Sequence, residues 1–255
     1  MSLDACAQLV DRGDPDRFLA VMAAPLWARE LLFPLYAFNL EIARAPWVAQ
    51  EPLVAEMRLQ WWRDMVAAAE SGAAKAHEVA GPLHGLIRDA GLPVTVLDRL
   101  IAARRWDCWH EPFADAAALE AYVEDTGAGL MWLAARALGA PDGAEAAVRA
   151  FGWASGLANL LRAVPELQAR GRQPLPAGTD PGALARQGLA RLAEARKACR
   201  TLPKAAAPAL LAGWQAEPLL RIAARDPAAV PEGRLLLSEF SRRGRLMWQA
   251  FSSRW

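Results

Sequence analysis

Residues 116–141, AAALEAYVEDTGAGLMWLAARALGAP, form the longest uninterrupted helical pattern in the chain. The larger side chains recur every three or four residues and so share one side of a helix: Leu119, Tyr122, Thr126, Leu130, Leu133 and Ala137. Gly127 and Gly129 lack side chains, which predicts that a second helix approaches closely there. The run Gly139-Ala140-Pro141 is a stop signal, so we expect the helix to end near Gly139.

The composition of the whole chain favours helix in the same way. Val, Ile and Thr total 20 of 255 residues, whereas Ala, Leu, Arg and Glu, which are good helix formers, dominate. With 54% apolar residues and a net charge of +1, the chain is not of the disordered class. We therefore predict an all-α fold.

Further helical patterns fill most of the remaining sequence, separated by short Pro- and Gly-rich breaks. We expect helices over residues 15–43, 52–72, 75–90, 94–108, 144–164, 182–202, 205–224 and 232–251. Asp14 or Asp16 is the expected N-cap of the first of these helices, and Pro46 is expected to end or kink the same helix. Pro165 is expected to break the helix over residues 144–164. Residues 170–181 read as a loop, and residues 1–255 read as a single domain.

Several common chemistries are absent from the sequence. The three cysteines, Cys6, Cys108 and Cys199, form no CxxC pair, so we expect scattered reduced thiols and neither a disulfide scaffold nor a zinc finger. Nucleotide-binding glycine motifs, HExxH and GxSxG are also missing. His110 precedes Pro112 and reads as part of an exposed turn rather than as a general base.

Charge is distributed unevenly along the chain. From Arg186 to Trp255 there are 13 basic and 5 acidic residues, a balance of +8, whereas residues 1–185 carry 16 and 23, a balance of −7. A basic C-terminal third indicates contact with something acidic, such as lipid headgroups, a partner protein or nucleic acid. The alternative is that arginine stems cover apolar helix faces while their guanidinium groups stay in water.

Four segments resemble the squalene/phytoene synthase family and occur in the family's order. They are LYAFNLEIAR (35–44), EMRLQWWRDMV (56–66), ALEAYVEDTGAGLMWLAARALGAP (118–141) and GLANLLRAVPELQARGRQPLP (156–176), with DRFLAVMAAPLWAR (16–29) as a weaker match. The resemblance implies a single-domain helical bundle of the isoprenoid-synthase type around a central cavity. Active members condense two prenyl diphosphates with magnesium, which two aspartate-rich helices hold.

The aspartates of that metal site are missing here. The resemblance places the four family metal-ligand positions at Ala43, Trp47, Ala163 and Leu167. Of the second motif only Glu166 remains, and Glu41 is about 200° around the helix from Ala43, so it should face away. We therefore expect no metal and no catalytic residue, and a pocket that is vestigial.

Other pocket residues of the family are retained. They are Asn39, Arg58, Gln60, Tyr122, Asn159, Arg162, Glu166, Arg170 and Arg172. Tyr122 and the Trp61–Trp62 pair read more readily as core packing than as ligand contacts, whereas Asn159 suits either role. Pro165 makes an Arg162–Glu166 ion pair doubtful.

The combination of AFNLEIAR and LLRAVP without the aspartates resembles a degenerate branch of the family, which includes a mitochondrial complex I assembly factor. It implies a non-catalytic interaction or assembly factor for a membrane-associated complex, with an unknown protein partner and no nucleic acid. The alternative is a prenyltransferase with an altered metal site, which would use magnesium. A third reading is a carrier of an isoprenoid or lipid ligand, and an indole of Trp47 that plugs the pocket would weaken both ligand-binding readings.

Our expectation for the location of the protein rests on two features of the sequence. The N-terminal residues carry no basic targeting region, and the longest uncharged stretch near them is too short to span a bilayer. We expect a cytoplasmic protein, with peripheral contact to the inner face of the membrane as a further expectation.

Overall fold

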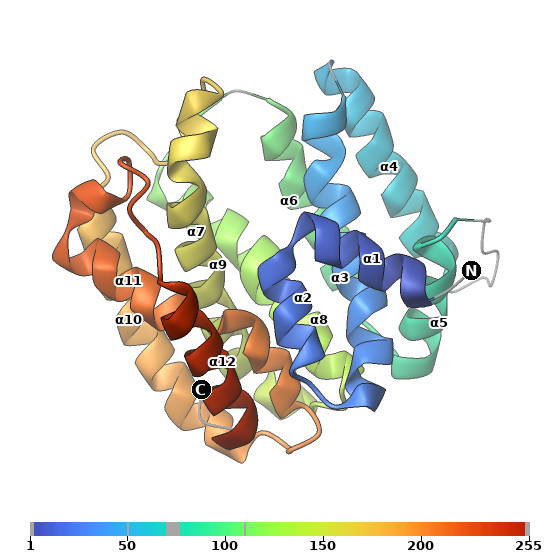
Figure 1. The fold of residues 1–255 in the computed structure, drawn as a ribbon. Helices are drawn as coiled ribbons and strands as arrows, with labels where there is room; N and C mark the ends of the chain where they lie inside the picture. The colour runs from blue at the N-terminus through green and yellow to red at the C-terminus, as the bar shows by residue number, and fades with distance from the viewer. Residues whose placement is uncertain (1–2, 50, 70–76, 110, 253–255) are drawn as a thin grey trace.

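The chain folds entirely into helices and connecting segments over the residues described by a computed structural model, which are 3–49, 51–69, 77–109 and 111–252. No strand occurs among those residues, which confirms the all-α prediction (Figure 1). The N-terminal half contains α1 (Leu3–Gly13), α2 (Pro15–Met22), α3 (Leu26–Val48), α4 (Pro52–Ala68), α5 (Ala80–Ala90), α6 (Val94–Ala103) and the 3₁₀ turn η1 (Arg104–Cys108).

The second half begins with the long helix predicted from the sequence. The segment from Ala116 to Ala137 is helical throughout but divides into α7 (Ala116–Val123), a π-helical turn η2 (Glu124–Ala128) and α8 (Gly129–Ala137). The remaining elements are η3 (Asp142–Ala144), α9 (Glu145–Ala169), α10 (Pro181–Ala198), η4 (Cys199–Thr201), η5 (Ala207–Gly213), α11 (Ala216–Arg225), η6 (Pro227–Ala229) and α12 (Glu239–Ser252).

Two long helices organise the bundle. Helix α3 packs against α1, α2, α4, α5 and α8, and α9 packs against α8, α10 and α11 (Figure 1). Leu32 through Leu40 are all buried, so the central part of α3 is enclosed on every side rather than amphipathic. Helix α8 and the η2 turn lie between the two halves and contact α9.

Close approach of two backbones joins the halves where η2 crosses α9. A Cβ added at Gly127 would lie 2.7 Å from the Gly156 Cα, and one added at Gly152 would lie 2.8 Å from the Ala128 Cα. The prediction was right for Gly127 and wrong for Gly129, where an added Cβ would meet only ordinary contacts at 3.5 Å or more. Gly152 and Gly156 could not be predicted from the sequence, because their role depends on which helix crosses the η2 turn.

Neither proline breaks its helix as predicted. Helix α3 continues through Pro46 to Val48, and α9 continues through Pro165 to Ala169. Pro46 lies in the last turn of α3, where little helix remains to be disrupted. Around Pro165, Val164 and Leu167 remain buried, and such burial contributes about 1.5–3 kcal/mol per side chain, which offsets the lost hydrogen bond.

The predicted helix starts were right at one end of the chain and wrong at the other. Asp14 is the N-cap of α2, and its carboxylate accepts a hydrogen bond from the Arg17 amide at 3.0 Å. Helix α12 begins at Glu239 instead of residue 232, because the Ser238 hydroxyl accepts from the Ser241 amide and caps the helix there. The predicted boundaries at residues 72 and 75, and the turn at His110, lie outside the described residues.

We expect the three thiols to be unreactive in the folded protein. All three cysteines are free and buried. Burial raises the pKa of Cys6, Cys108 and Cys199 to about 11 in each case, so the reactive thiolate is scarce at neutral pH. A disulfide reagent added at about pH 8 should label none of them within minutes and all three in denaturant. Rapid labelling of the native chain would contradict the burial of these groups.

Candidate functional site

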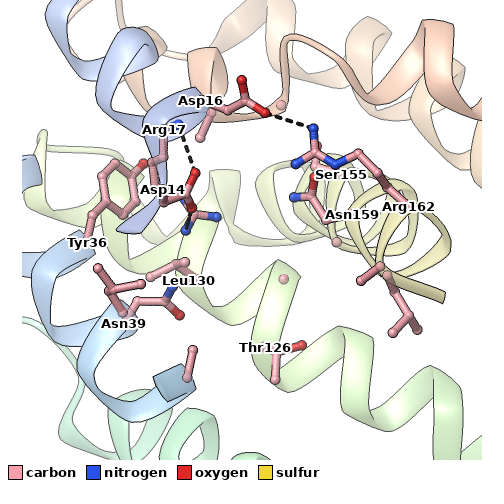
Figure 2. Close-up of a pocket in the computed structure, with 18 of the residues that line it drawn as sticks. Asp14, Asp16, Arg17, Tyr36, Asn39, Thr126, Leu130, Ser155, Asn159 and Arg162 are labelled. Carbon is pink, nitrogen blue, oxygen red and sulfur yellow. Dashed lines mark hydrogen bonds and ion pairs between the residues drawn. The ribbon is translucent and has the colours of Figure 1, made fainter. Parts of the chain in front are cut away.

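A cavity of about 530 Å³ lies between α2, α3, the η2–α8 segment, α9 and η5 (Figure 2). The π-helical turn η2 forms part of the cavity wall. Turns of this kind inside α-helices are frequent at functional sites. Thr126 lines the cavity from this turn, and its hydroxyl donates to the Tyr122 carbonyl at 2.6 Å. The backbone irregularity and the cavity therefore coincide.

Arginine side chains engage the acidic groups at the α2 end of the cavity. The Arg17 guanidinium donates to Asp14 at 2.8 Å, and Arg162 from α9 donates to Asp16 at 2.8 Å (Figure 2). Arg242 from α12 also donates to Asp16. These contacts tie α2, α9 and α12 together, and they leave the two carboxylates neutralised by neighbouring cations.

A second polar cluster closes the side of the cavity near η1. The Tyr122 hydroxyl donates to the Asp107 carboxylate at 2.9 Å, while Arg104 donates to Tyr122 at 2.8 Å and to Asp107 at 3.2 Å. Burial raises the pKa of Tyr122 above its ordinary value despite the nearby Arg104, so the phenol stays protonated and donates. Tyr122 is thus a hydrogen-bonded packing residue that also lines the cavity.

Arg172 supports this cluster from behind. Its guanidinium donates to the backbone carbonyls of Asp107 at 2.7 Å and of Trp106 at 2.9 Å, and it lies 4.2 Å from the Trp106 ring centroid. The side chain is only 2% exposed. Arg172 therefore holds the η1 turn in place, and it does not reach the cavity as the resemblance implied.

The four family metal-ligand positions do lie at the cavity: Ala43, Trp47, Ala163 and Leu167. Glu166 also lines it, but its carboxylate accepts from Arg170 at 2.6 Å instead of pairing with Arg162. The Arg170 guanidinium in turn lies 4.6 Å from the Trp47 ring centroid. Trp47 remains 40% exposed, so its indole stands at the mouth of the cavity and does not fill it.

Two amides face each other across the cavity from α3 and α9. Asn39 and Asn159 both line it, and Figure 2 shows them on opposite sides. Asn39 is 5% exposed, and its Oδ1 atom has no hydrogen-bond partner within the described structure. A buried amide oxygen of this kind requires a water molecule or a ligand group.

Three residues retained from the family lie elsewhere. Arg58 is exposed and reaches Glu41 at 3.9 Å, and Gln60 is exposed and donates to Asp64 at 2.8 Å. With Arg172, these residues are corrections to the predicted pocket. Glu41 faces away from the cavity, as expected. Trp62 is a core residue, and its ring packs edge-on against Phe38.

Sequence reasoning missed the residues that α2 and η1 contribute to the cavity: Asp14, Asp16, Arg17, Arg104 and Asp107. The available signal was DPDR, in which three charged residues surround a proline at a helix start. Nothing in the sequence says that Arg162 of α9 reaches Asp16 of α2. Within the described part of the chain, no three His, Cys, Asp or Glu side chains are grouped so that they could hold a metal ion.

Acid should weaken the fold through Asp16. Burial alone would raise the pKa of Asp16, but hydrogen bonds from Arg162, Gln215 and Arg242 outweigh it and lower the pKa below 3.8. A lowered folded-state pKa contributes stability above the unfolded value, and that stability is lost as pH falls through the folded value. In urea unfolding at about pH 6 and about pH 3, Asp16→Asn should therefore lose less stability than the wild type. Equal losses would show that the Asp16 ion pairs do not stabilise the fold.

Comparisons with known proteins identify relatives of this chain. The family model described as squalene/phytoene synthase matches residues 10–179. NADH dehydrogenase (ubiquinone) complex I, assembly factor 6 homolog of Drosophila melanogaster is 32% identical over 178 residues, and the Bos taurus assembly factor 6 is 30% identical over 172. Both matches cover 67% of this chain and 52% of the relative, so the chain spans about half the length of these curated relatives.

Solved structures show the same fold over nearly the whole chain. A dehydrosqualene synthase in complex with ligand superposes with a TM-score of 0.82 at 16% identity, covering 98% of this chain and 95% of that one. Squalene synthase HpnC from Alicyclobacillus acidocaldarius superposes with a TM-score of 0.75 at 18% identity, covering 89% and 94%. The helices, the position of the cavity and the matched residues lead to one conclusion: this chain belongs to the squalene/phytoene synthase family.

Proposed function

We propose that this chain is a non-catalytic member of its family that acts as an assembly or interaction factor for a membrane-associated complex. The relatives named complex I assembly factor 6 support a complex of the NADH dehydrogenase type as the partner. The chain spans about half the length of those relatives, so we do not assign their activity to it. A partner of this type is proposed for this chain alone.

The observation that carries the proposal is the chemistry of the cavity wall. Magnesium requires several hard oxygen ligands in octahedral geometry. The family metal positions here are apolar, and arginines already pair with the cavity carboxylates, so the donor set does not fit a magnesium cluster. A bound prenyl diphosphate would add ~3 negative charges, which are costly in a cavity without metal.

An exposed apolar corner at the mouth of this cavity is suited to a protein partner. The end of α3 and the start of α4 expose Trp47, Val48, Leu53, Val54 and Met57, with Trp109 beside them. We call these six residues the α3–α4 corner. Tryptophan and methionine are enriched in protein interfaces. Glu51 is exposed on the same segment, and Glu56 is paired with Arg105 at 3.1 Å, so this corner offers no excess of positive charge to anionic lipid headgroups.

The test is complementation in cells of the source organism that lack the gene. Assembled NADH dehydrogenase complex is measured on a native gel after expression of the wild type, Leu53→Glu or Leu26→Glu. Leu53 and Leu26 are 64% and 74% exposed in the first turns of α4 and α3, so the two changes are matched. We expect Leu53→Glu to lose at least about tenfold of the assembled complex, because a charge in an apolar interface is costly, and Leu26→Glu to restore it. Full assembly without the gene would contradict the proposed role.

A prenyltransferase with an altered metal site is the second candidate, and the open cavity with the unpartnered Asn39 oxygen favours it. It predicts that farnesyl diphosphate with magnesium binds in calorimetry and that Glu166→Ala abolishes the binding. Turnover of farnesyl or geranylgeranyl diphosphate by the purified chain would establish this candidate and overturn the non-catalytic proposal. Lipid that co-purifies in native mass spectrometry without turnover would instead indicate a carrier.

A further inference from the structure

Helix α12 presents its apolar face to solvent. Four large side chains recur along one stripe of this helix at helical spacing and are 60–89% exposed: Phe240, Met247, Trp248 and Phe251. Gly244 occupies the fifth position of the same stripe. A surface helix of a globular protein normally places such a stripe against the core. None of the described helices combines the length and the apolar content that crossing a bilayer requires.

Polar contacts hold the opposite face of α12 on the protein. Arg242 pairs with Asp16 at the edge of the cavity, and the Arg245 guanidinium lies 3.7 Å from the Glu217 carboxylate. Gln249 and Leu246 complete the inward face, at 6% and 7% exposure. These ion pairs fix the orientation of α12 on the protein. The apolar stripe is therefore exposed because of the way the helix is held, although the helix itself is packed.

The charge around the stripe is basic. Arg243 is adjacent to it, with a side chain that is 77% exposed and an Nε atom 3.4 Å from the Glu239 carboxylate. Helix α12 itself carries three arginines and one glutamate, and the sequence from residue 186 onward has a balance of +8. An aromatic, apolar stripe with an exposed arginine beside it, on a segment of net positive charge, resembles helices that lie in the interface of a bilayer with anionic headgroups.

We propose that α12 is a membrane-docking helix that inserts Phe240, Met247, Trp248 and Phe251 into the headgroup–acyl boundary of an anionic bilayer. The small area of the stripe favours a bilayer over a second copy of the chain as its binding partner. A helix of 14 residues is about 21 Å long, so its outer stripe offers about 200 Å². A stable protein interface needs about 800 Å² from each partner, whereas an interfacial helix inserts only its own apolar face.

Vesicle flotation of the full chain tests the proposal. Vesicles of phosphatidylcholine with about 30% phosphatidylglycerol are compared with vesicles of phosphatidylcholine alone. We expect the wild type to bind the anionic vesicles and Met247→Glu/Phe251→Glu to bind at least about tenfold more weakly. Leu26→Glu/Leu53→Glu makes the same chemical change at exposed apolar positions on α3 and α4, and it should bind like the wild type.

A charge variant and an oligomer measurement complete the test. Arg243→Gln should weaken binding to the anionic vesicles about fivefold and leave the circular dichroism spectrum unchanged. The proposal is overturned if the wild type does not float with the anionic vesicles, or if Met247→Glu/Phe251→Glu floats equally well. A wild-type dimer in light scattering that this double variant converts to monomer would assign the stripe to a second copy instead. The proposed protein contact at the α3–α4 corner does not depend on these outcomes. It involves a different surface, and it is tested by complementation instead of vesicle binding.

Discussion

Replacing Gly152 with alanine is expected to destabilise the fold by about 2 kcal/mol, although alanine is the better helix former. The new Cβ would lie 2.8 Å from the Ala128 Cα, 2.8 Å from the Met131 Cβ and 2.9 Å from the Gly127 carbonyl oxygen. These are atoms of the neighbouring helix close to its backbone, so no flexible side chain can move aside. Relief requires that α9 and the η2 turn separate, which also disturbs the wall of the cavity.

Gly85→Ala provides the matched control in urea unfolding. Gly85 lies in the interior of α5, and nothing stands within 4 Å of a Cβ built there. Alanine should therefore stabilise the fold by about 0.5–1 kcal/mol through helix propensity alone. The two variants are thus expected to move the free energy of unfolding in opposite directions. If Gly152→Ala is neutral or stabilising, the backbone contact between η2 and α9 is not as close as described.

Removing the Asp107 carboxylate is expected to have the largest effect of any single substitution considered, about 3–5 kcal/mol for Asp107→Ala. Asp107 is 9% exposed and is the common partner of Tyr122 and Arg104. Arg172 lies behind it with its Nη1 atom 3.9 Å from the Asp107 carboxylate. Without that anion, two largely buried guanidinium groups remain next to each other and lack a counter-charge.

Two further variants separate charge from contact. Asp107→Asn keeps an oxygen that can accept from Tyr122 but removes the charge, so it should cost less than alanine while remaining clearly destabilising. Glu194 and Lys197 form an exposed ion pair, with side chains that are 73% and 68% exposed respectively. Glu194→Ala removes this pair and should change stability by less than about 0.5 kcal/mol. Thermal unfolding followed by circular dichroism measures all three. An Asp107→Ala protein as stable as the Glu194→Ala protein would show that the cluster is not structural.

The cavity also shows which site residues could be predicted. The resemblance located Ala43, Trp47, Ala163 and Leu167, because each occupies a defined place in a motif on a single helix. Structure placed all four at the cavity. Arg58, Gln60 and Arg172 were misplaced, because retention of a residue type does not specify which partner its side chain finds. Arg172, for instance, binds two backbone carbonyls of η1, and no short-range pattern encodes that contact.

Local propensity and spacing sufficed for the helical class of this protein, for an N-cap at Asp14 or Asp16 and for a loop from residue 170 to the start of α10, while the resemblance to the family located the metal positions that lack aspartates. These properties depend on neighbours within a few residues, where physical preferences are direct. Tertiary structure alone decided that α3 and α9 survive their prolines, that arginines from distant helices neutralise the cavity carboxylates, and that α12 turns its aromatic stripe outward. Each of those outcomes balances a local cost against contacts between segments far apart in the chain, and that balance is set only when the helices pack together.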